Sequence, residues 1–480
     1  MTVSRGTDAS SPRKLRWDSI NWKRVQRSVR RLQIRIAQAG KERNHRRVKA
    51  LQWLLTHSLY AKALAVKRVT RNKGKNTPGI DGVVWQTPSK KMMAVKTLVR
   101  RGYQAKALRR VYIPKKNGTK RPLSIPTMRD RAMQALYLLA LSPVAETTAD
   151  LNSYGFREKR SCADAIECSF QGLAKWYSPQ WILECDIKSC FDAISHRWLL
   201  DNVPMDKRVL KQWLSAGVVW NNNLFPTMSG TPQGGIASPV LANLALDGLE
   251  KAVKDAVKGR RKVYVIRYAD DFIVTGDSKE LLEKTVKPAI ENFLADRGLT
   301  LSNEKTTITH INDGFDFLGQ TIRKYRGKLL ITPSKKSTKL FLRKVRAMIK
   351  ANAQARQSSL IALLNPVIRG WATYHRHVVS TKTFQYIDHH IFWEIWHWCR
   401  RRHYKRAAGW VRSRYFRTVK FRRWVFASAD EALVLASSIH IRRHVRIRIA
   451  ANPYNAADQE YFTARARRSR PNPYSYSTDG

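Results

Sequence analysis

The stretch VIRYADDFIVTG (residues 265–276) places two adjacent carboxylates, Asp270 and Asp271, at a tight reversal between two apolar, β-branched runs. This pattern predicts a strand–turn–strand unit. Two neighbouring carboxylates at the tip of a buried hairpin repel each other and lose hydration, so they destabilise the fold unless something neutralises them. Mg²⁺ can do so, because it takes oxygen ligands and is usually held by carboxylates and substrate phosphates. A solvated turn is the ordinary interpretation, but the flanking apolar strands argue against it.

The charge of the chain is its most unusual bulk property. The 480 residues include 90 Lys and Arg against 35 Asp and Glu, a formal net charge of +55. Such a balance predicts a polyanionic partner bound through its phosphates. Membrane-surface binding is the alternative, but it requires an amphipathic anchor, a lipidation signal or a long apolar run, and the sequence shows none. Nucleic acid is therefore the expected partner, and no membrane association is expected.

The cysteines and the N-terminus indicate an intracellular protein. The five cysteines form no CxxC pair and show no zinc-finger spacing: Cys162, Cys168, Cys185, Cys190 and Cys399. The N-terminus lacks the apolar core of a secretory signal. Reduced thiols are the expectation. The start of the chain (2–16) could be a transit segment, but Asp8 and its brevity argue against one.

The order of patterned segments predicts an α+β region followed by an all-helical one. Residues 17–50 read as one basic helix with an apolar stripe through Val25, Val29, Leu32 and Ile36, and it carries most of the fourteen Lys and Arg between residues 13 and 50. A second helix spans about 50–70. Residues 109–126 form an expected hairpin with a basic turn, 129–141 a helix, 182–187 a strand and 238–253 a helix with Ser238 as N-cap. After Pro333, three amphipathic helices predict a small bundle, the second of them starting at Asn365-Pro366.

Two further segments supply what a phosphoryl-transfer site needs. Asp186 is an acid inside the apolar run ILECDI (182–187), where an unpaired carboxylate is costly. It could be a buried salt-bridge partner, or it could share ions with Asp270 and Asp271, as in a two-metal displacement. The turn of the 109–126 hairpin holds Lys115, Lys116, Lys120 and Arg121, which could clamp a triphosphate.

Six blocks of sequence carry a resemblance to a known family. They are RRVYIPKKNGTKRPLSIP (109–126), YGFREKRSCADAI (154–166), ILECDIKSCFDAISH (182–196), GTPQGGIASPVLANLALDGLE (230–250), VIRYADDFIVTG (265–276) and LSNEKTTITHINDGFDFLG (301–319). In order and spacing, this set resembles the successive blocks of group II intron-encoded reverse transcriptases. NPVIRGWATYHR (365–376) resembles the maturase, or thumb, segment that separates these enzymes from viral ones. The likeness covers residues 17–463.

The resemblance implies a role for individual residues. Asp186, Asp270 and Asp271 match the catalytic aspartates, and the carbonyl of Ile187 is an expected further metal contact. Lys115, Arg121, Phe191, Gln233 and Lys305 match residues around the incoming nucleotide, with Phe191 as the gate against ribonucleotides. Tyr268 and Ala269 match the position of the primer end. From the residues alone, Phe191 would more often belong to a core and Gln233 to a loop. The implied cofactors are two Mg²⁺ ions, with dNTPs as substrates.

The C-terminal part of the chain is basic and rich in aromatic residues. From Arg400 to Trp424 there are eleven Lys and Arg and no acids. Basic side chains track phosphates and aromatic rings stack on unpaired bases, although a helical core with a solvated face is also possible. In the family this region resembles a DNA-binding segment. Nucleic-acid contacts are expected at Arg24, Arg27, Arg31, Arg369, Arg400, Arg401, Arg402, Lys405, Arg412 and Arg414.

Residues 441–462 resemble the stretch that precedes a zinc-bearing His-Asn-His nuclease domain. The residues after Thr463 contain no cysteine or histidine, so second-strand DNA cleavage is not expected of this chain.

The expected fold is an α+β, right-hand polymerase. Its expected parts are a disordered start (1–16), a basic helical extension (17–100), fingers and palm (101–330), a helical thumb (331–404) and a basic DNA-binding appendix with a flexible tail (405–480). The expected function is RNA-directed DNA synthesis together with binding of the parent group II intron RNA, assistance to its splicing and mobility, and use of an RNA template and a DNA primer or target. The alternatives are a defence- or diversification-associated reverse transcriptase and an RNA-folding maturase without polymerase activity. The expected location is a bacterial cytoplasmic ribonucleoprotein, with an organelle as the alternative, and the oligomeric state is open.

Overall fold

The described residues form four sheets. The computed structural model describes residues 16–114, 118, 120–257, 259, 262–419 and 421–469. The central sheet is antiparallel and has the order β6 (Val265–Tyr268), β7 (Asp271–Gly276), β3 (Trp181–Asp186), β8 (Thr307–His310). A second sheet has the order β2 (Lys120–Ile125), β1 (Leu108–Pro114), β4 (Val218–Trp220), β5 (Asn223–Phe225). Strands β9 (Phe315–Phe317), β10 (Gln320–Tyr325) and β11 (Lys328–Pro333) form the third, and β12 (Phe416–Val419) and β13 (Arg422–Phe426) the fourth.

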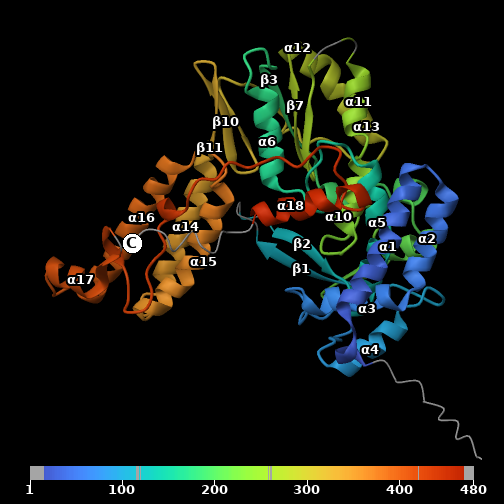
Figure 1. Cartoon of the computed structure of the whole chain (residues 1–480), viewed down its shortest axis with the longest axis horizontal. Coiled ribbons are helices and arrows are strands. Elements are labelled where there is room, and N and C mark those ends of the chain that lie inside the picture. The colour runs from blue at the N-terminus through green and yellow to red at the C-terminus, as the bar shows by residue number, and fades with distance from the viewer. Residues whose placement is uncertain are drawn as a thin grey trace, which may run out of the picture.

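In sequence order the helices of the described residues fall into three groups (Figure 1). The N-terminal group is α1 (Trp22–Lys41), α2 (His45–His57), α3 (Leu59–Arg71) and α4 (Pro88–Thr97). The middle group is α5 (Met128–Thr148), α6 (Cys162–Leu173), α7 (Cys190–Ala193), α8 (His196–Asn202), α9 (Lys207–Leu214), α10 (Ser238–Leu246), α11 (Leu249–Ala256), α12 (Lys279–Leu281) and α13 (Lys287–Ala295). The C-terminal group is α14 (Lys335–Ala351), α15 (Gln357–His375), α16 (Thr381–Arg402), α17 (Ala408–Tyr415) and α18 (Gln459–Ser469). Helix α18 of this last group lies with the body, apart from the arm that α14–α17 form (Figure 1). In the described part of the chain, no helix has the length and apolarity needed to cross a membrane.

Some expected helices are divided in the structure. The prediction of a single helix over 17–50 is wrong, because α1 ends at Lys41 and Arg43 has φ 54°. The side chain of Asn44 then accepts from the Arg47 N–H and caps the start of α2. A second break replaces the helix expected over 238–253. There the chain leaves α10 at Asp247 and turns at Gly248, whose φ of 96° favours glycine, before α11.

Two expected helix starts also differ from the structure. Ser238 lies inside α10, where Ala237 is the N-cap, although Pro239 is in the first turn as expected. The bundle helix expected to begin at Asn365-Pro366 is α15, which begins at Gln357 and continues through Pro366. Proline removes one intrahelical hydrogen bond, but Pro366 and Ala362 are both exposed, so water can satisfy the freed carbonyl.

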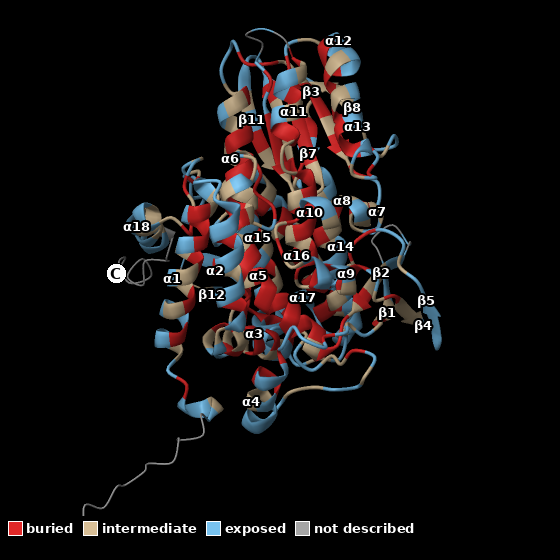
Figure 2. Ribbon diagram, turned by 90° about the vertical axis from the view of Figure 1, so that its right-hand side faces the viewer, coloured by how far each residue is buried: buried red, intermediate tan, exposed pale blue. Residues whose placement is uncertain are grey.

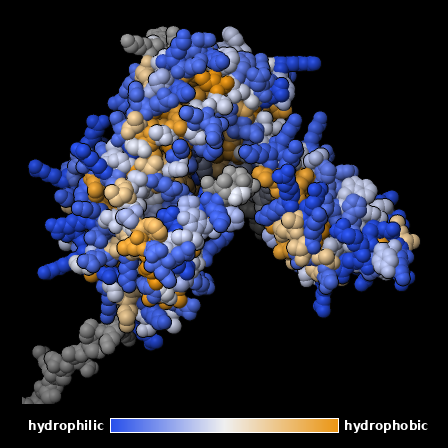
Figure 3. Space-filling view, turned by 180° about the vertical axis from the view of Figure 1, so that it is seen from behind, coloured by the Kyte–Doolittle hydropathy of each residue, from blue (hydrophilic) through white to orange (hydrophobic). Residues whose placement is uncertain are grey.

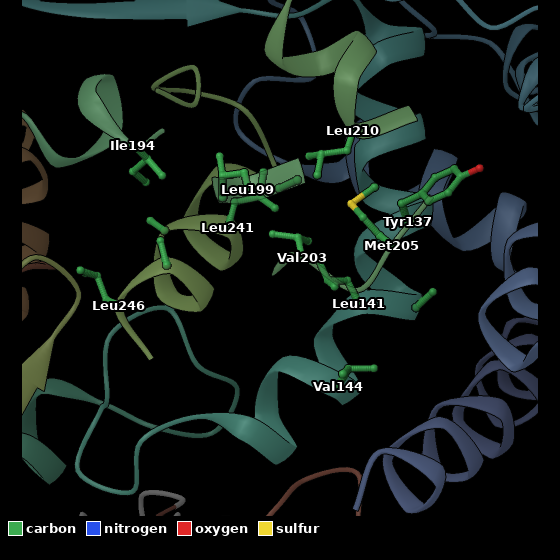
Figure 4. Packing of buried hydrophobic residues seen from close by; sticks show 14 of the residues in the cluster. Tyr137, Leu141, Val144, Ile194, Leu199, Val203, Met205, Leu210, Leu241 and Leu246 are labelled. Carbon is green, nitrogen blue, oxygen red and sulfur yellow. The ribbon is translucent and has the colours of Figure 1, made fainter. Parts of the chain in front are cut away.

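The central sheet is buried on both faces. Leu183, Phe272 and Val274 point into a core shared with the middle and N-terminal helices, whereas Ile182 and Ile273 point into a second core with α6 and the β9–β11 sheet. This alternation follows the two-residue period of a strand. Helix α5 runs through the larger core and is buried along most of its length (Figure 2), and it packs there against residues of α8, α9 and α10 (Figure 4).

The C-terminal helices have a core of their own. The apolar side of α16, made of Phe384, Ile387, Ile391, Ile395 and Trp398, is buried there with residues of α14 and α15. The space-filling view shows this bundle as a separate lobe, with a hollow between it and the N-terminal lobe (Figure 3). The architecture is therefore an α+β body with a helical arm.

The segment after β13 returns from the arm to the body. Asp164, at the start of α6, accepts from the Ile447 N–H (2.8 Å), from Arg465 (2.8 Å) and from His444 (2.9 Å). Further along, Arg30 of α1 donates to the Pro453 carbonyl. Residues 441–469, expected to belong to an appendix, thus pack on α6 and α1. The disordered start expected over 1–16 lies outside the described residues except for Arg16, and so do residues 470–480 at the end of the region for which a flexible tail was expected.

His375, at the end of α15, gives a test of the packing between α15 and α14. Its ring is buried beside Trp371 and the Ser337 hydroxyl, and burial and the neighbouring His377 lower its pKa to about 4. Because the folded state resists protonation of this ring, stability falls as the pH drops from about 6.5 towards 4. Between pH 7.5 and pH 5, the free energy of unfolding of His375→Gln should therefore fall by about 2 kcal/mol less than that of the wild type. Urea unfolding at the two pH values measures this difference. The exposed change His389→Gln is the control, and an equal effect of both variants would contradict this account.

Candidate active site

Three aspartates from two strands meet at one end of the central sheet. Asp186 is the last residue of β3 and lies directly opposite Asp271, the first residue of β7. Asp270 lies in the two-residue turn that Tyr268 and Asp271 close, and Ala269 has φ 61° there. Antiparallel pairing therefore brings together carboxylates that are 84 and 85 positions apart in the sequence.

The electrostatics of this cluster leave it short of positive charge. Burial, together with the neighbouring carboxylates of Asp186 and Asp270, raises the pKa of Asp271 to about 7. Burial also raises the pKa of Asp270. Lys305 Nζ lies 2.6 Å from Asp186 Oδ2, and this hydrogen bond raises the pKa of the ammonium group. Lys305 thus faces three crowded carboxylates, and Arg121 also lowers the pKa of Asp270.

The donor set fits a hard divalent cation. All side-chain donors in the cluster are carboxylate oxygens, which Mg²⁺ prefers. Ile187 directly follows Asp186 and lines the same cavity. The bridge between Ile187 and Leu301 does not use the Ile187 carbonyl, because its two hydrogen bonds run from the Ser302 N–H to the Asp186 carbonyl and from the Lys188 N–H to the Thr300 carbonyl. Across the described residues, no three His, Cys, Asp or Glu side chains are grouped as a ready-made metal site. In this conformation Lys305 instead provides the counter-charge to Asp186.

A cavity of about 1520 Å³ opens beside the aspartates. Among the residues that line it are Arg121, Phe156, Asp186, Ile187, Phe191, Asp192, Gln233, Asp270 and Lys305. The structure therefore brings together most of the expected nucleotide contacts, which come from β2, the β3–α7 junction, the start of α10 and the loop before β8. Lys115 lies outside the described residues, and Asp271, Tyr268 and Ala269 lie beside the cavity without lining it.

Gln233 and Phe191 are held by specific contacts. Gln233 Nε2 donates to Asp192 Oδ2 (3.1 Å), and the backbone carbonyl of Gln233 accepts from the Ser124 N–H (2.7 Å). Gly234 next to it has φ 113°, and a Cβ there would lie 2.8 Å from the Ser124 carbonyl oxygen, so the approach of this loop to β2 requires glycine. Phe191 is half-buried against the core and meets Phe156 edge to face. It is both a core residue and a wall of the cavity.

A buried hydrogen-bond network, which the sequence reasoning missed, supports the aspartate turn from behind. Arg267, almost fully buried in β6, donates to Asn243 Oδ1 (3.1 Å) and Asp247 Oδ1 (2.5 Å) of the α10 region and reaches the Ala269 carbonyl (3.5 Å). Asn243 in turn donates to the Gly155 carbonyl (2.8 Å). Burial raises the pKa of Asp247 to about 6. A charged residue inside an apolar strand was the signal that could have revealed this network.

Tyr268 faces away from the cavity, towards the helical arm. Its hydroxyl lies beside the Cys162 thiol, and burial together with that thiol raises its pKa to about 12. Tyr374 of α15 approaches the same thiol and donates to the Leu318 carbonyl (2.8 Å). The aspartate hairpin is therefore connected to the arm through Cys162.

Comparison with known proteins assigns these parts. Residues 113–322 match the model of the reverse transcriptase (RNA-dependent DNA polymerase) family, 17–98 the N-terminal domain of reverse transcriptase, and 338–416 the group II intron maturase-specific domain. Protein YkfC of Escherichia coli is 33% identical over 59% of this chain and 85% of its own length. The chain belongs to the group II intron reverse transcriptase family. It is an RNA-directed DNA polymerase, a class of nucleotidyltransferase that generally uses divalent metal ions and that binds RNA and nucleic-acid templates.

Other relatives of this reverse transcriptase are matched over less of their length. The group II intron-encoded protein LtrA of Lactococcus lactis is 29% identical over 57% of this chain and 56% of its own length. A 91 kDa protein in the cob intron of Schizosaccharomyces pombe is 30% identical over 45% of this chain and 34% of its own. A solved telomerase from Candida albicans aligns with a TM-score of 0.36 and 12% identity over 61% of this chain and 59% of that chain, too weak a likeness to support an argument.

The basic residues expected to contact nucleic acid fall into two sets in this reverse transcriptase. Exposed on α1, α15 and the α16–α17 region are Arg24, Arg27, Arg31, Arg369, Arg401, Lys405, Arg412 and Arg414. The other set makes contacts within the fold: Arg400 donates to the Arg406 carbonyl (2.7 Å), and Arg402 to the carbonyls of Ala353 (2.7 Å) and Ala355 (3.0 Å). The guanidinium of Arg402 therefore already has two partners, which tie the end of α16 to the link between α14 and α15.

Gly155 offers a test of how the aspartate turn is positioned. A Cβ at Gly155 would lie 2.3 Å from the Ala269 nitrogen, so Gly155→Ala must displace the turn. We expect DNA synthesis on a primed RNA template to fall by about 100-fold, because a shift near 1 Å in a catalytic group has an effect of that size. Gly370→Ala on α15 is the matched control, since its Cβ would meet nothing within 4 Å. Full activity in Gly155→Ala would show that the turn tolerates the displacement.

Proposed function

We propose that the aspartate cluster is the site of RNA-templated DNA synthesis and that Asp186, Asp270 and Asp271, with the Ile187 carbonyl, hold two Mg²⁺ ions. The observation that carries the proposal is the direct opposition of Asp186 and Asp271, next to Asp270, at the mouth of a cavity that also holds basic residues. When bound, the two ions activate the primer 3′-hydroxyl and stabilise the leaving pyrophosphate. The substrates are dNTPs, an RNA template and a DNA primer.

The residues around the cavity would bind and orient the nucleotide. Arg121 is exposed on β2 at the cavity wall, where its guanidinium can grip the triphosphate in two-pronged fashion. Lys305 can exchange its bond to Asp186 for a phosphate oxygen, since its side chain is exposed. Gln233, fixed by Asp192 and by Ser124, would line the base and sugar pocket. Lys115 is proposed for the triphosphate on the resemblance alone, and Tyr268 and Ala269 for the primer end.

We propose further that the protein binds its parent group II intron RNA and assists splicing and mobility, as a ribonucleoprotein in the bacterial cytoplasm. Two findings support this: the maturase-specific match over 338–416 and the net charge of +55, which suits the assembly of many phosphates. The proposed parts are the extension to residue 100, fingers and palm to 330, thumb to 404 and a DNA-binding region beyond. A maturase without polymerase activity is the second candidate. The presence of all three aspartates, Lys305, Arg121 and Gln233 in one place disfavours it.

The double change Asp270→Ala, Asp271→Ala tests the site. We expect it to abolish cDNA synthesis from an RNA template in the presence of Mg²⁺, while leaving the affinity for intron RNA largely unchanged, because the aspartates are not part of a phosphate-binding surface. Primer extension and filter binding measure the two activities. The control is Asp313→Ala, an exposed acid outside the cavity. Persistent cDNA synthesis would refute the site, and absence of synthesis by the wild type would favour the maturase alone.

Phe191 tests the choice between deoxy- and ribonucleotides. Removing its ring should admit a 2′-hydroxyl, so Phe191→Ala should raise the kcat/KM for rNTPs relative to dNTPs by about tenfold or more. Single-nucleotide incorporation measures this ratio. The control is Phe421→Ala, a phenylalanine that is 95% exposed in the β12–β13 turn. An unchanged ratio would leave Phe191 only its packing role.

A further inference from the structure

Helix α16 carries rings on both sides. One side is buried in the thumb core. The opposite side carries Tyr386, His389, His390, Trp393 and His397, which fall within about one third of the circumference at 3.6 residues per turn. We name these five residues the α16 ring face. A helix that is apolar or aromatic all round is normally buried, so an exposed side of this kind needs explanation.

The rings form a continuous row along the helix. Ring centroids lie 4.3 Å apart for Tyr386 and His390, 6.2 Å for His389 and Trp393, and 6.2 Å for Trp393 and His397. The two largest rings remain open to solvent, with Tyr386 52% and Trp393 44% exposed. The row is thus held in place by its own contacts while its outer surface stays accessible.

Charge around the ring face favours a phosphate-bearing partner. Lys382 and Arg401 are exposed at its two ends. The segment 381–426 contains only two acids, and both have partners inside the fold: Asp388 accepts from the Ala436 and Ser437 N–H groups (2.6 and 2.9 Å), and Glu394 from Arg346 (2.5 Å). Rings for stacking, flanked by cations and with the nearby carboxylates engaged, are what unpaired nucleic-acid bases require.

We propose that the α16 ring face binds unpaired bases of RNA, which stack on Tyr386 and Trp393 while Lys382 and Arg401 meet the adjacent phosphates. The imidazoles and the tyrosine hydroxyl can hydrogen-bond a 2′-hydroxyl, which favours RNA over DNA. None of these residues lines the polymerase cavity, so this is a separate surface. It rests on the proposed function in that the intron RNA is its natural ligand.

The test uses the full chain and a labelled, unstructured single-stranded RNA of about 20 nucleotides. We expect the double change Tyr386→Ala, Trp393→Ala to weaken binding by about tenfold or more, since each lost stack contributes on that scale. The slope of log affinity against log salt should stay the same, because no phosphate contact is removed. Tyr386→Phe, Trp393→Phe should retain the affinity, and a changed slope in the alanine variant would show that charge rather than stacking was lost.

Controls separate the possible outcomes. Trp176→Ala removes a tryptophan that is 85% exposed on the palm and should leave RNA affinity unchanged. Unchanged RNA affinity in the double alanine variant overturns the proposal, and an equal loss of affinity for DNA of the same sequence overturns the commitment to RNA. Thermal unfolding of the alanine variant must match the wild type. If it does not, Tyr386→Leu, Trp393→Leu replaces it, because leucine keeps apolar packing but cannot stack on a base: RNA affinity should still fall, and unchanged affinity overturns the proposal. Primer extension on a primed template should continue in every variant, so failure of this surface is distinct from failure of the polymerase site.

Discussion

The opposition of Asp186 and Asp271 across an antiparallel ladder is the constraint on which the rest of the molecule depends. Two carboxylates held at adjacent strand positions repel each other, and burial strengthens the repulsion because the surrounding dielectric is low. Only a rigid scaffold can keep them there. The central sheet provides it through close-packed cores on both faces, and Arg267 fixes the turn to α10 with three hydrogen-bonded contacts.

The same constraint explains how positive charge is distributed near the site. Arg267 is buried and already has partners, so it sets geometry. Lys305 and Arg121 are exposed at the cavity, where the proposed function has them meet the substrate. The buried Arg267 thus positions the turn, whereas exposed basic side chains, Lys305 and Arg121 among them, line the cavity.

Much of this site could be predicted from sequence because its chemistry is local. Each part is a pattern of a few residues: adjacent acids in an apolar hairpin, an acid at the end of an apolar strand, and a basic turn. The order of the sequence blocks then indicated that these parts belong to one site. Arg267, Asn243 and Gly155 were not predicted because their roles arise from contacts between distant parts of the chain. In the sequence Gly155 indicates only a turn, whereas in the structure a Cβ there would lie 2.3 Å from the Ala269 nitrogen. Helix ends were missed for a related reason. Asn44 caps α2 in the middle of a pattern that looks continuously helical, and Pro366 is tolerated because its surroundings are open to water.

The contacts of Asp164 determine when this part of the fold can be completed during synthesis. Its carboxylate receives His444 and Arg465, which are 280 and 301 positions later in the chain. At about 5–20 residues per second, a ribosome needs roughly 15–60 s to make that stretch. During this interval the nascent body would expose the surface on α6 and α1 that residues 441–469 later cover, so the native body can be completed only after residue 465 has been made.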